Sequence, residues 1–282
     1  VTFTNKAAGE LQERLLAHYK NKKMLKRMRI GTFHSLALRT LRENGANITI
    51  IDEYAAQTLA DEALKEQNIN MSAKTFLREL SRQKNGAESE LSPQLIECYQ
   101  QKLAAYQAAD FDDILLNALT LATDDPNYGK GTHLLVDEFQ DINELQLRLI
   151  EAWAKRADSL FIIGDPDQSI YGFRGSKADC FEISLQKHPQ AQTIGLTENY
   201  RSTAEILNCA QAFLSDGHSP KLHTSRTLNL PVRLKDTDGP LAEGIYIAEE
   251  IDRLVGGIDM VKAHNNKRSR RGDQTHSLSD IA

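Results

Sequence analysis

The sequence contains little cysteine, few aromatic residues and no long apolar run. Its three cysteines, Cys98, Cys180 and Cys209, lie far apart. This spacing excludes a disulfide framework and a zinc knuckle, and it favours a reducing, cytoplasmic location. Apolar stretches such as residues 134–136 and 161–163 are far shorter than the roughly 18 residues that a membrane-spanning helix needs. The sequence therefore predicts a protein without a membrane partner.

Charge of one sign does not dominate the chain, because 34 basic residues face 39 acidic ones and the net charge is -5. This balance argues against a strongly basic nucleic-acid-binding protein. Positive charge is nevertheless concentrated in two runs, at residues 20–29 and 262–271. Such runs are either solvated loops or contacts for phosphate groups, and the sequence leaves both interpretations open.

Strand and helix patterns alternate along most of the chain. Short segments typical of strands lie at residues 1–4, 29–32, 132–136, 160–164, 193–196 and 232–234, with amphipathic helices predicted between them. This alternation predicts an α/β fold with a mostly parallel sheet that helices cover on both faces. A chain of 282 residues with 40% hydrophobic residues is long enough for roughly two domains.

Residues 52–110 interrupt the alternation. They contain helical segments at 52–67, 72–84 and 92–109 and no strand signal, which predicts an all-helical insertion. We therefore expect residues 1–51 and 111–196 to form a first domain and residues 197–282 to begin a second one. Because the sequence starts in a strand pattern and stops where another strand is expected, we also expect both ends to be boundaries within a longer protein.

Two adjacent acids follow the apolar strand at 132–136. Asp137 and Glu138 would lie at the carboxyl edge of a parallel sheet, where such folds bind ligands. One carboxylate can hold Mg²⁺, and the next can orient or deprotonate a water that attacks a γ-phosphate. This pattern predicts nucleotide hydrolysis. The alternative is a helix start with acids that interact favourably with the helix dipole.

The following strand ends in a second polar segment at residues 164–175, with the sequence GDPDQSIYGFRG. Gln168 can contact a phosphate, and Tyr171 and Phe173 offer stacking faces for unpaired bases. The alternative is that these two aromatic residues only anchor the loop on the core.

Six strings in this order resemble the signature motifs of the UvrD/Rep/PcrA family of superfamily-one DNA helicases. They are TFTNKAA at 2–8, GTFHS at 31–35, FDD at 111–113, VDEFQD at 136–141, GDPDQSIYGFRG at 164–175 and LTENYRS at 196–202. Any one string would be weak evidence, but together they cover residues 1 to 202.

The resemblance implies an ATP-driven motor that moves 3′ to 5′ along single-stranded DNA. It implies a RecA-like P-loop NTPase sheet with a helical insertion and the start of a second RecA-like domain, and a role in DNA repair, replication restart or recombination. The implied partners are single-stranded DNA, DNA junctions and repair or replication proteins, and the implied cofactors are ATP and Mg²⁺.

The resemblance also implies a role for individual residues. Asp137 would hold Mg²⁺, Glu138 would activate the hydrolytic water, and Gln168 would sense the γ-phosphate. Tyr200 would lie against the adenine, and Arg201 would contact the γ-phosphate. The positions implied to face DNA are Phe3, Thr4, Asn5, Thr32, Phe33, His34, Tyr171, Phe173 and Arg174.

The sequence departs from the family pattern at several points. No G-x-x-x-x-G-K-[ST] string occurs in it, and the later motifs of the second motor domain are absent as well. Phe173 occupies a position that is often tryptophan, and Pro166 replaces a common acid. We therefore expect this chain alone to be inactive as an ATPase. The alternative function is a non-catalytic DNA-binding or scaffold module derived from such a motor.

Overall fold

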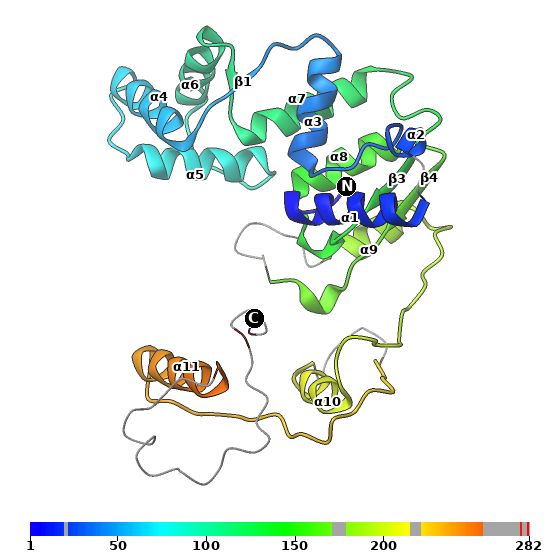
Figure 1. The fold of residues 1–282 in the computed structure, drawn as a ribbon. Helices are drawn as coiled ribbons and strands as arrows, with labels where there is room; N and C mark the ends of the chain where they lie inside the picture. The colour runs from blue at the N-terminus through cyan, green and yellow to red at the C-terminus, as the bar shows by residue number, and fades with distance from the viewer. Residues whose placement is uncertain (20–21, 171–178, 215–220, 256–276, 278–280, 282) are drawn as a thin grey trace. The chain divides into compact units, whose positions relative to one another are not determined.

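The computed structural model describes residues 1–19, 22–170, 179–214, 221–255, 277 and 281. Within them the protein is a mixed α/β structure, mostly helical, with two small parallel sheets (Figure 1). The chain divides into two compact units, which we describe separately. Unit 1 contains Val1–Thr197 and Leu214–Leu222, and unit 2 contains Glu198–Phe213 and His223–Ala282.

The main sheet of unit 1 is built around two parallel strands. β3 (His133–Val136) pairs with β4 (Ser159–Ile162), with Val136 opposite Ile162. The first residues of the chain extend this sheet, because the Asp137 amide donates to the Val1 carbonyl at 3.0 Å and Thr2 bridges Thr32 in parallel. The strands predicted at 132–136 and 160–164 are confirmed. At 1–4 and 29–32 the structure has an isolated bridge.

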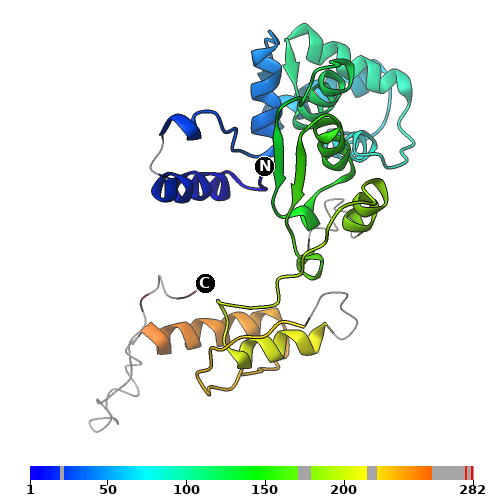
Figure 2. The same ribbon diagram turned by 90° about the vertical axis from the view of Figure 1, so that its right-hand side faces the viewer.

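Helices pack on one face of these strands. α3 (Phe33–Glu43), α7 (Phe111–Asp124) and α8 (Glu144–Ala154) share one hydrophobic core with Val136. α1 (Asn5–Tyr19) lies on the other side of the strands, and the short α2 (Lys22–Leu25) follows it (Figure 2). That side is only partly covered, since Leu135 and Phe161 remain 55% and 53% exposed. The expectation that helices cover both faces is therefore not met by the described residues.

Side-chain caps explain where the core helices begin. Thr32 accepts from the Ser35 amide at the start of α3. Asp110 and Asp113 form a capping box at α7, and Asn143 and Gln146 form another at α8. Each cap pairs backbone N–H groups that have no partner within the helix.

The segment 52–110 forms a separate helical cluster with its own core. α4 (Glu53–Glu66), α5 (Ala73–Lys84) and α6 (Pro93–Ala105) pack around buried side chains, and the rings of Phe76 and Tyr99 meet edge to face at 5.4 Å. The prediction of no strand here is wrong. The helix expected to reach residue 109 ends at Ala105, and β2 (Ala108–Ala109) pairs in parallel with β1 (Thr49–Ile50).

A buried ion-pair cluster joins this insertion to the rest of unit 1. Lys84 Nζ at the end of α5 lies 2.7 Å from Asp110 Oδ2 and 2.7 Å from Asp113 Oδ1 at the start of α7. Only 8% of the Lys84 side chain is exposed. Charge thus holds the middle of the insertion against the start of α7, while the pairing of β1 with β2 holds its two ends together.

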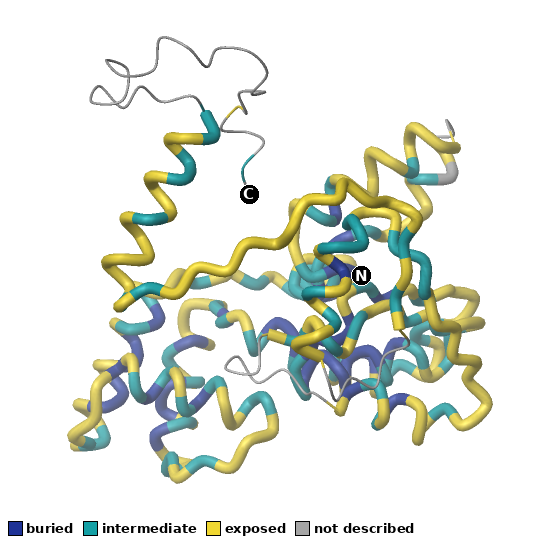
Figure 3. The backbone as a smooth tube through the Cα atoms, turned by 90° about the horizontal axis from the view of Figure 1, so that it is seen from below, coloured by how far each residue is buried: buried dark blue, intermediate teal, exposed yellow. Residues whose placement is uncertain are grey.

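Unit 2 contains α10 (Ala204–Phe213) and α11 (Pro240–Val255) and little buried apolar surface (Figure 3). The Glu205 carboxylate links α10 to the following segment, because it accepts from the Thr227 hydroxyl at 2.6 Å and the Asn229 amide at 2.8 Å. The strands predicted at 193–196, in unit 1, and at 232–234, in unit 2, are wrong, since these described residues have no strand pairing. Ile194 and Leu234 are 75% and 94% exposed.

Two further features concern charge and membranes. The basic run at 262–271 lies outside the described residues, and the run at 20–29 is described in part, with Arg29 in an ion pair with Glu43 at 2.8 Å. Among the described residues, no helix has both the length and the apolar character that crossing a membrane requires.

Candidate nucleotide-hydrolysis site

The carboxyl end of β3 presents Glu138 on a sharp turn. Glu138 has a left-handed backbone (φ 54°), and a short 3-10 helix, η1 (Phe139–Asp141), follows it. The base of this turn is fixed because Phe139 is fully buried, its ring meets that of Phe181 at 5.1 Å, and its carbonyl accepts from Cys180 Sγ at 3.2 Å. Cys180 begins α9 (Cys180–Lys187), and burial raises its thiol pKa to about 11. The exposed Glu138 side chain therefore projects from a rigid support.

The loop after β4 carries the second set of polar residues. η2 (Pro166–Gln168) begins after Asp165, whose carboxylate accepts from the Asp167 amide at 3.1 Å. The Gln168 amide nitrogen donates to the same carboxylate at 2.7 Å. Gln168 is thereby held on the surface of this loop.

Gln140 connects the two loops. Its Nε2 donates to Glu138 Oε2 at 2.7 Å, and its Oε1 accepts from the Asp165 amide at 3.0 Å. The Ser169 hydroxyl donates to the Gln140 carbonyl at 3.3 Å. The residue is 3% exposed. Gln140 thus ties the loop after β3, which carries Glu138, to the loop after β4, which carries Gln168.

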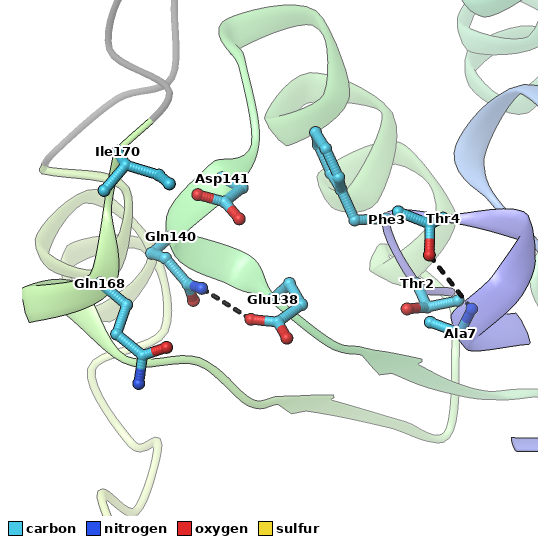
Figure 4. A pocket seen from close by; sticks show the side chains of 9 residues that line it. All are labelled: Thr2, Phe3, Thr4, Ala7, Glu138, Gln140, Asp141, Gln168 and Ile170. Atoms are coloured by element: carbon cyan, nitrogen blue, oxygen red, sulfur yellow. Dashed lines mark hydrogen bonds between the residues drawn. The ribbon is translucent and has the colours of Figure 1, made fainter. Parts of the chain in front are cut away.

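A pocket of about 290 Å³ opens beside these loops (Figure 4). It is lined by Thr2, Phe3, Thr4, Ala7, Glu138, Gln140, Asp141, Gln168 and Ile170. Four of the residues selected from the sequence, Phe3, Thr4, Glu138 and Gln168, therefore share one cavity. Thr4 also accepts from the Ala7 amide at 3.1 Å and so caps α1, whereas Asn5 is an exposed residue of the first turn.

The pocket is acidic. Burial, and then the neighbouring Glu138, raise the pKa of Asp141. Two buried oxygens that have no hydrogen-bond partner among the described residues, Thr2 Oγ1 and Asp141 Oδ1, belong to residues of its lining. The lining contains no lysine or arginine. Oxygen atoms of this kind suit hydrated Mg²⁺, but a polyphosphate would need positive charge from elsewhere.

Asp137, the residue selected as a Mg²⁺ ligand, lies directly before Glu138 and outside the pocket lining. Among the described residues no group of three or more His, Cys, Asp or Glu side chains could hold a metal ion. A Mg²⁺ bound at these carboxylates would therefore need most of its oxygen ligands from water or from a nucleotide.

The second predicted DNA segment begins α3 and lies outside this pocket. Thr32 is the helix cap, whereas Phe33 is 2% exposed and stacks on Trp153, with ring centroids 6.3 Å apart. Phe33 belongs to the core, so its side chain is not available for the DNA contact expected from the sequence. His34 meets the ring of Phe111 at 5.4 Å, and burial lowers its pKa although Asp112 opposes this shift. Burial thus favours the neutral form of His34, which suits hydrogen bonding better than charge pairing.

Tyr200 and Arg201 lie in unit 2, on a turn that two side chains fix. Asn199 Oδ1 accepts from the Arg201 and Ser202 amides at 3.0 and 2.8 Å. Arg226 Nη1 donates to the Tyr200 and Arg201 carbonyls at 2.8 and 3.0 Å. Tyr200 is 79% exposed. Tyr171, Phe173 and Arg174 lie outside the described residues.

Three polar residues of the pocket lining were not predicted from the sequence to have a role. They are Gln140 and Asp141, which lie within the VDEFQD string, and Thr2. No local signal in the sequence marks Gln140, which lies between Phe139 and Asp141 in a mixed apolar and acidic segment. Its partner, Asp165, lies 25 residues further along the chain.

The sequence is similar to a known family of DNA helicases and to individual members of it. The profile of the UvrD/REP helicase N-terminal domain matches residues 1–189. The chain belongs to the UvrD/Rep helicase family. It is 33% identical to an ATP-dependent DNA helicase PcrA of Leuconostoc citreum over 76% of the chain and 32% of that protein. It is 32% identical to a probable DNA helicase II homologue of Mycoplasma capricolum over 90% of the chain and 40% of the relative.

A PcrA of Staphylococcus aureus is also 32% identical, over 89% of the chain and 38% of its own length. This UvrD/Rep family member therefore spans about a third to two fifths of the length of these relatives. The family match includes the strings that supply the pocket, from residue 2 to residue 170.

Proposed function

We propose that this chain is the core of an ATP-dependent DNA helicase or translocase that moves 3′ to 5′ on single-stranded DNA. The observation that carries the proposal is the shared pocket, in which Glu138 and Gln168 from the sheet edge lie with Phe3 and Thr4. Membership in the UvrD/Rep family supports it. A RecA-like arrangement for unit 1, with residues 52–110 as an insertion and 197–282 beginning a second motor domain, is part of this proposal.

Glu138 is the proposed base. Its carboxylate is exposed, and the donor from Gln140 binds one oxygen and leaves the other for a water. Asp137 would hold Mg²⁺, which when bound neutralises charge on the phosphates of ATP. Gln168 lies on the same rim and can hydrogen-bond a phosphate oxygen, while Tyr200 and Arg201 would contact adenine and γ-phosphate. Because the pocket lining lacks a cation, residues outside it must complete phosphate binding.

The proposed DNA contacts lie near the base. Phe3 and Thr4 line the pocket beside Glu138, so bound DNA and the hydrolytic water would occupy neighbouring positions. Asn5, Thr32, His34, Tyr171, Phe173 and Arg174 complete the proposed DNA surface. Substrates with single strands or junctions, partners from repair, replication or recombination, and a cytoplasmic location follow from this proposal.

The test is Glu138→Gln in the whole natural protein that contains these residues. This change keeps the shape of the side chain but removes its ability to accept a proton. We expect DNA-stimulated ATP hydrolysis to fall by roughly 100-fold or more, with ATP and DNA affinity retained. The matched control is Glu182→Gln on the exposed surface of α9, which should hydrolyse ATP like the wild type.

Two outcomes would count against the proposal. Retained turnover in Glu138→Gln would show that another group activates the water. A wild-type protein that binds single-stranded DNA but neither binds nor hydrolyses ATP would favour the non-catalytic DNA-binding module.

A further inference from the structure

Gln140 lies in the loop after β3, and its side chain connects this loop with the loop after β4. Its side chain is buried, yet each end makes a hydrogen bond to a different loop. Nε2 donates to the Glu138 carboxylate, as Figure 4 shows, and Oε1 accepts from the Asp165 amide. A side-chain amide suits this place because it carries a donor and an acceptor on one planar group. Both bonds also agree on the orientation of the amide, since the nitrogen meets an acceptor and the oxygen meets a donor.

The close approach of the two loops gives independent support. Gly164 lies two residues after the end of β4, and a Cβ atom there would lie 2.5 Å from Gln140 Oε1 and 2.9 Å from the Phe139 amide nitrogen. A glycine is therefore needed for the second loop to come within hydrogen-bond distance of Gln140. Because the absence of a side chain at Gly164 lets the two loops lie this close together, the Gln140 amide can bond to both of them.

The link continues to Gln168 through a single residue. Asp165 donates its amide to Gln140, and its carboxylate accepts from Gln168 Nε2 at 2.7 Å. A displacement of Gln168 would thus act on Asp165, then on Gln140 and finally on Glu138. Direct hydrogen bonds therefore connect Glu138, Gln140, Asp165 and Gln168 in sequence.

We propose that Gln140 is a positioning residue that aligns the Glu138 carboxylate according to the position of the Gln168 loop. The water-activating group is then correctly oriented only when that loop is in its phosphate-contacting position. This inference rests on the function proposed above. It gives a structural reason why contact between Gln168 and a phosphate would control water activation by Glu138. The competing view is that Gln140 only satisfies buried polar groups.

Gln146 provides a matched control for that competing view. It is another glutamine with low exposure, 7%, and its side chain and amide complete the capping box of α8. Gln140→Met and Gln146→Met remove the same polar group from similarly buried places. If Gln140 had only a structural role, both variants would lose stability and keep the wild-type kcat per folded molecule.

The first experiment measures single-stranded-DNA-stimulated ATP hydrolysis of the whole natural protein and both variants. We expect Gln140→Met to lower kcat by roughly 10- to 100-fold, because a shift of about 1 Å in a reacting group has this effect, with the KM for ATP changed less than about twofold. Gln146→Met should keep kcat. Equal kcat in the two variants, with an active wild type, would overturn the role of Gln140. An inactive wild type would instead overturn the proposed function.

A second variant and readout cover the case in which Gln140→Met folds poorly. Gln140→Glu keeps an acceptor for the Asp165 amide but puts a carboxylate against Glu138. In hydrogen-exchange measurements on the 282-residue chain, the Asp165 amide should stay protected in Gln140→Glu and lose protection in Gln140→Met. In the whole protein, Gln140→Glu should still lose kcat. Wild-type kcat in Gln140→Glu, or unchanged protection in Gln140→Met, would overturn the proposal.

Discussion

Replacing Lys84 by methionine should destabilise unit 1 more than any surface charge change in it. Lys84 Nζ lies 2.7 Å from both Asp110 and Asp113, and the three side chains are 8%, 20% and 13% exposed. Methionine fills most of the lysine volume, so packing is largely kept, but two carboxylates with little access to water lose their cation. Breaking a buried pair in this way costs about 3–5 kcal/mol. That is a large part of the stability of a typical domain, about 5–15 kcal/mol.

The effect should depend on pH in a defined direction. Burial raises the pKa of Asp113, and the Lys84 ammonium opposes this rise. Loss of the ammonium raises that pKa further. The folded state then binds a proton more tightly than the unfolded state, so stability is lost as pH rises through the folded pKa. The deficit in the free energy of unfolding of Lys84→Met should be largest at pH 7 and should narrow as the pH falls toward the ordinary carboxyl pKa.

The assay is urea denaturation followed by fluorescence of Trp153, the single tryptophan of the sequence, which packs in the core of unit 1. Lys102→Met is the control, because Lys102 pairs with Glu66 and Glu62, acids whose side chains are 60% and 52% exposed. Exposed pairs contribute little, so this variant should unfold close to the wild type. Equal effects of the two substitutions at pH 7, or a Lys84→Met deficit that does not change with pH, would refute the reasoning.

Two further predictions concern stability. Tyr99 is fully buried, and its hydroxyl has no hydrogen-bond partner among the described residues. Tyr99→Phe should therefore leave the free energy of unfolding unchanged, or raise it by up to about 1 kcal/mol, in the same urea assay. A clear loss of stability would contradict this prediction and reveal a partner for the hydroxyl. Hydrogen bonds from Thr227 and neighbouring groups lower the pKa of Glu205 to about 2, so its contribution to unit 2 is present above the ordinary carboxyl pKa and lost as pH falls toward 2. Exchange protection of the Asn229 amide, corrected for intrinsic rates, should decline over that range in the wild type, and Glu205→Gln should be less protected at pH 6 and insensitive to pH; equal protection in both proteins would contradict this account.

Helices were predictable because their signals are local. Thr32, Asp52, Ser72, Ser92 and Asn143 accept from backbone amides in the first turns of α3, α4, α5, α6 and α8, and each precedes a periodic apolar pattern. The ends were less certain, as α6 shows, because a terminal turn depends on what the chain does next. A capping residue followed by apolar residues at helical spacing is enough to predict a helix that buries one face.

Strands were less predictable because they need a partner. Residues 193–196 and 232–234 have strand-like composition, but they pair with nothing among the described residues and stay exposed. Ala108–Ala109, which has no strand-like composition, forms β2 because it lies beside β1. Pairing, rather than composition, decided each case.

The site residues also differ in whether local sequence or distant contacts determine their role. Glu138 and Gln168 could be selected because each follows a strand that ends at the same sheet edge. The core position of Phe33 and the bridging role of Gln140 could not be selected, since both depend on contacts with distant residues, Trp153 and Asp165. The motif pattern identifies a site, and the tertiary contacts determine which of its residues reach a ligand.

The most direct test of the central claim is strand displacement by the whole natural protein on a partial duplex with a single-stranded tail. The account predicts ATP-dependent unwinding when the tail is 3′, no unwinding when it is 5′, and no unwinding by Glu138→Gln on either substrate. Unwinding only from a 5′ tail, or unwinding by Glu138→Gln at the wild-type rate, would contradict it.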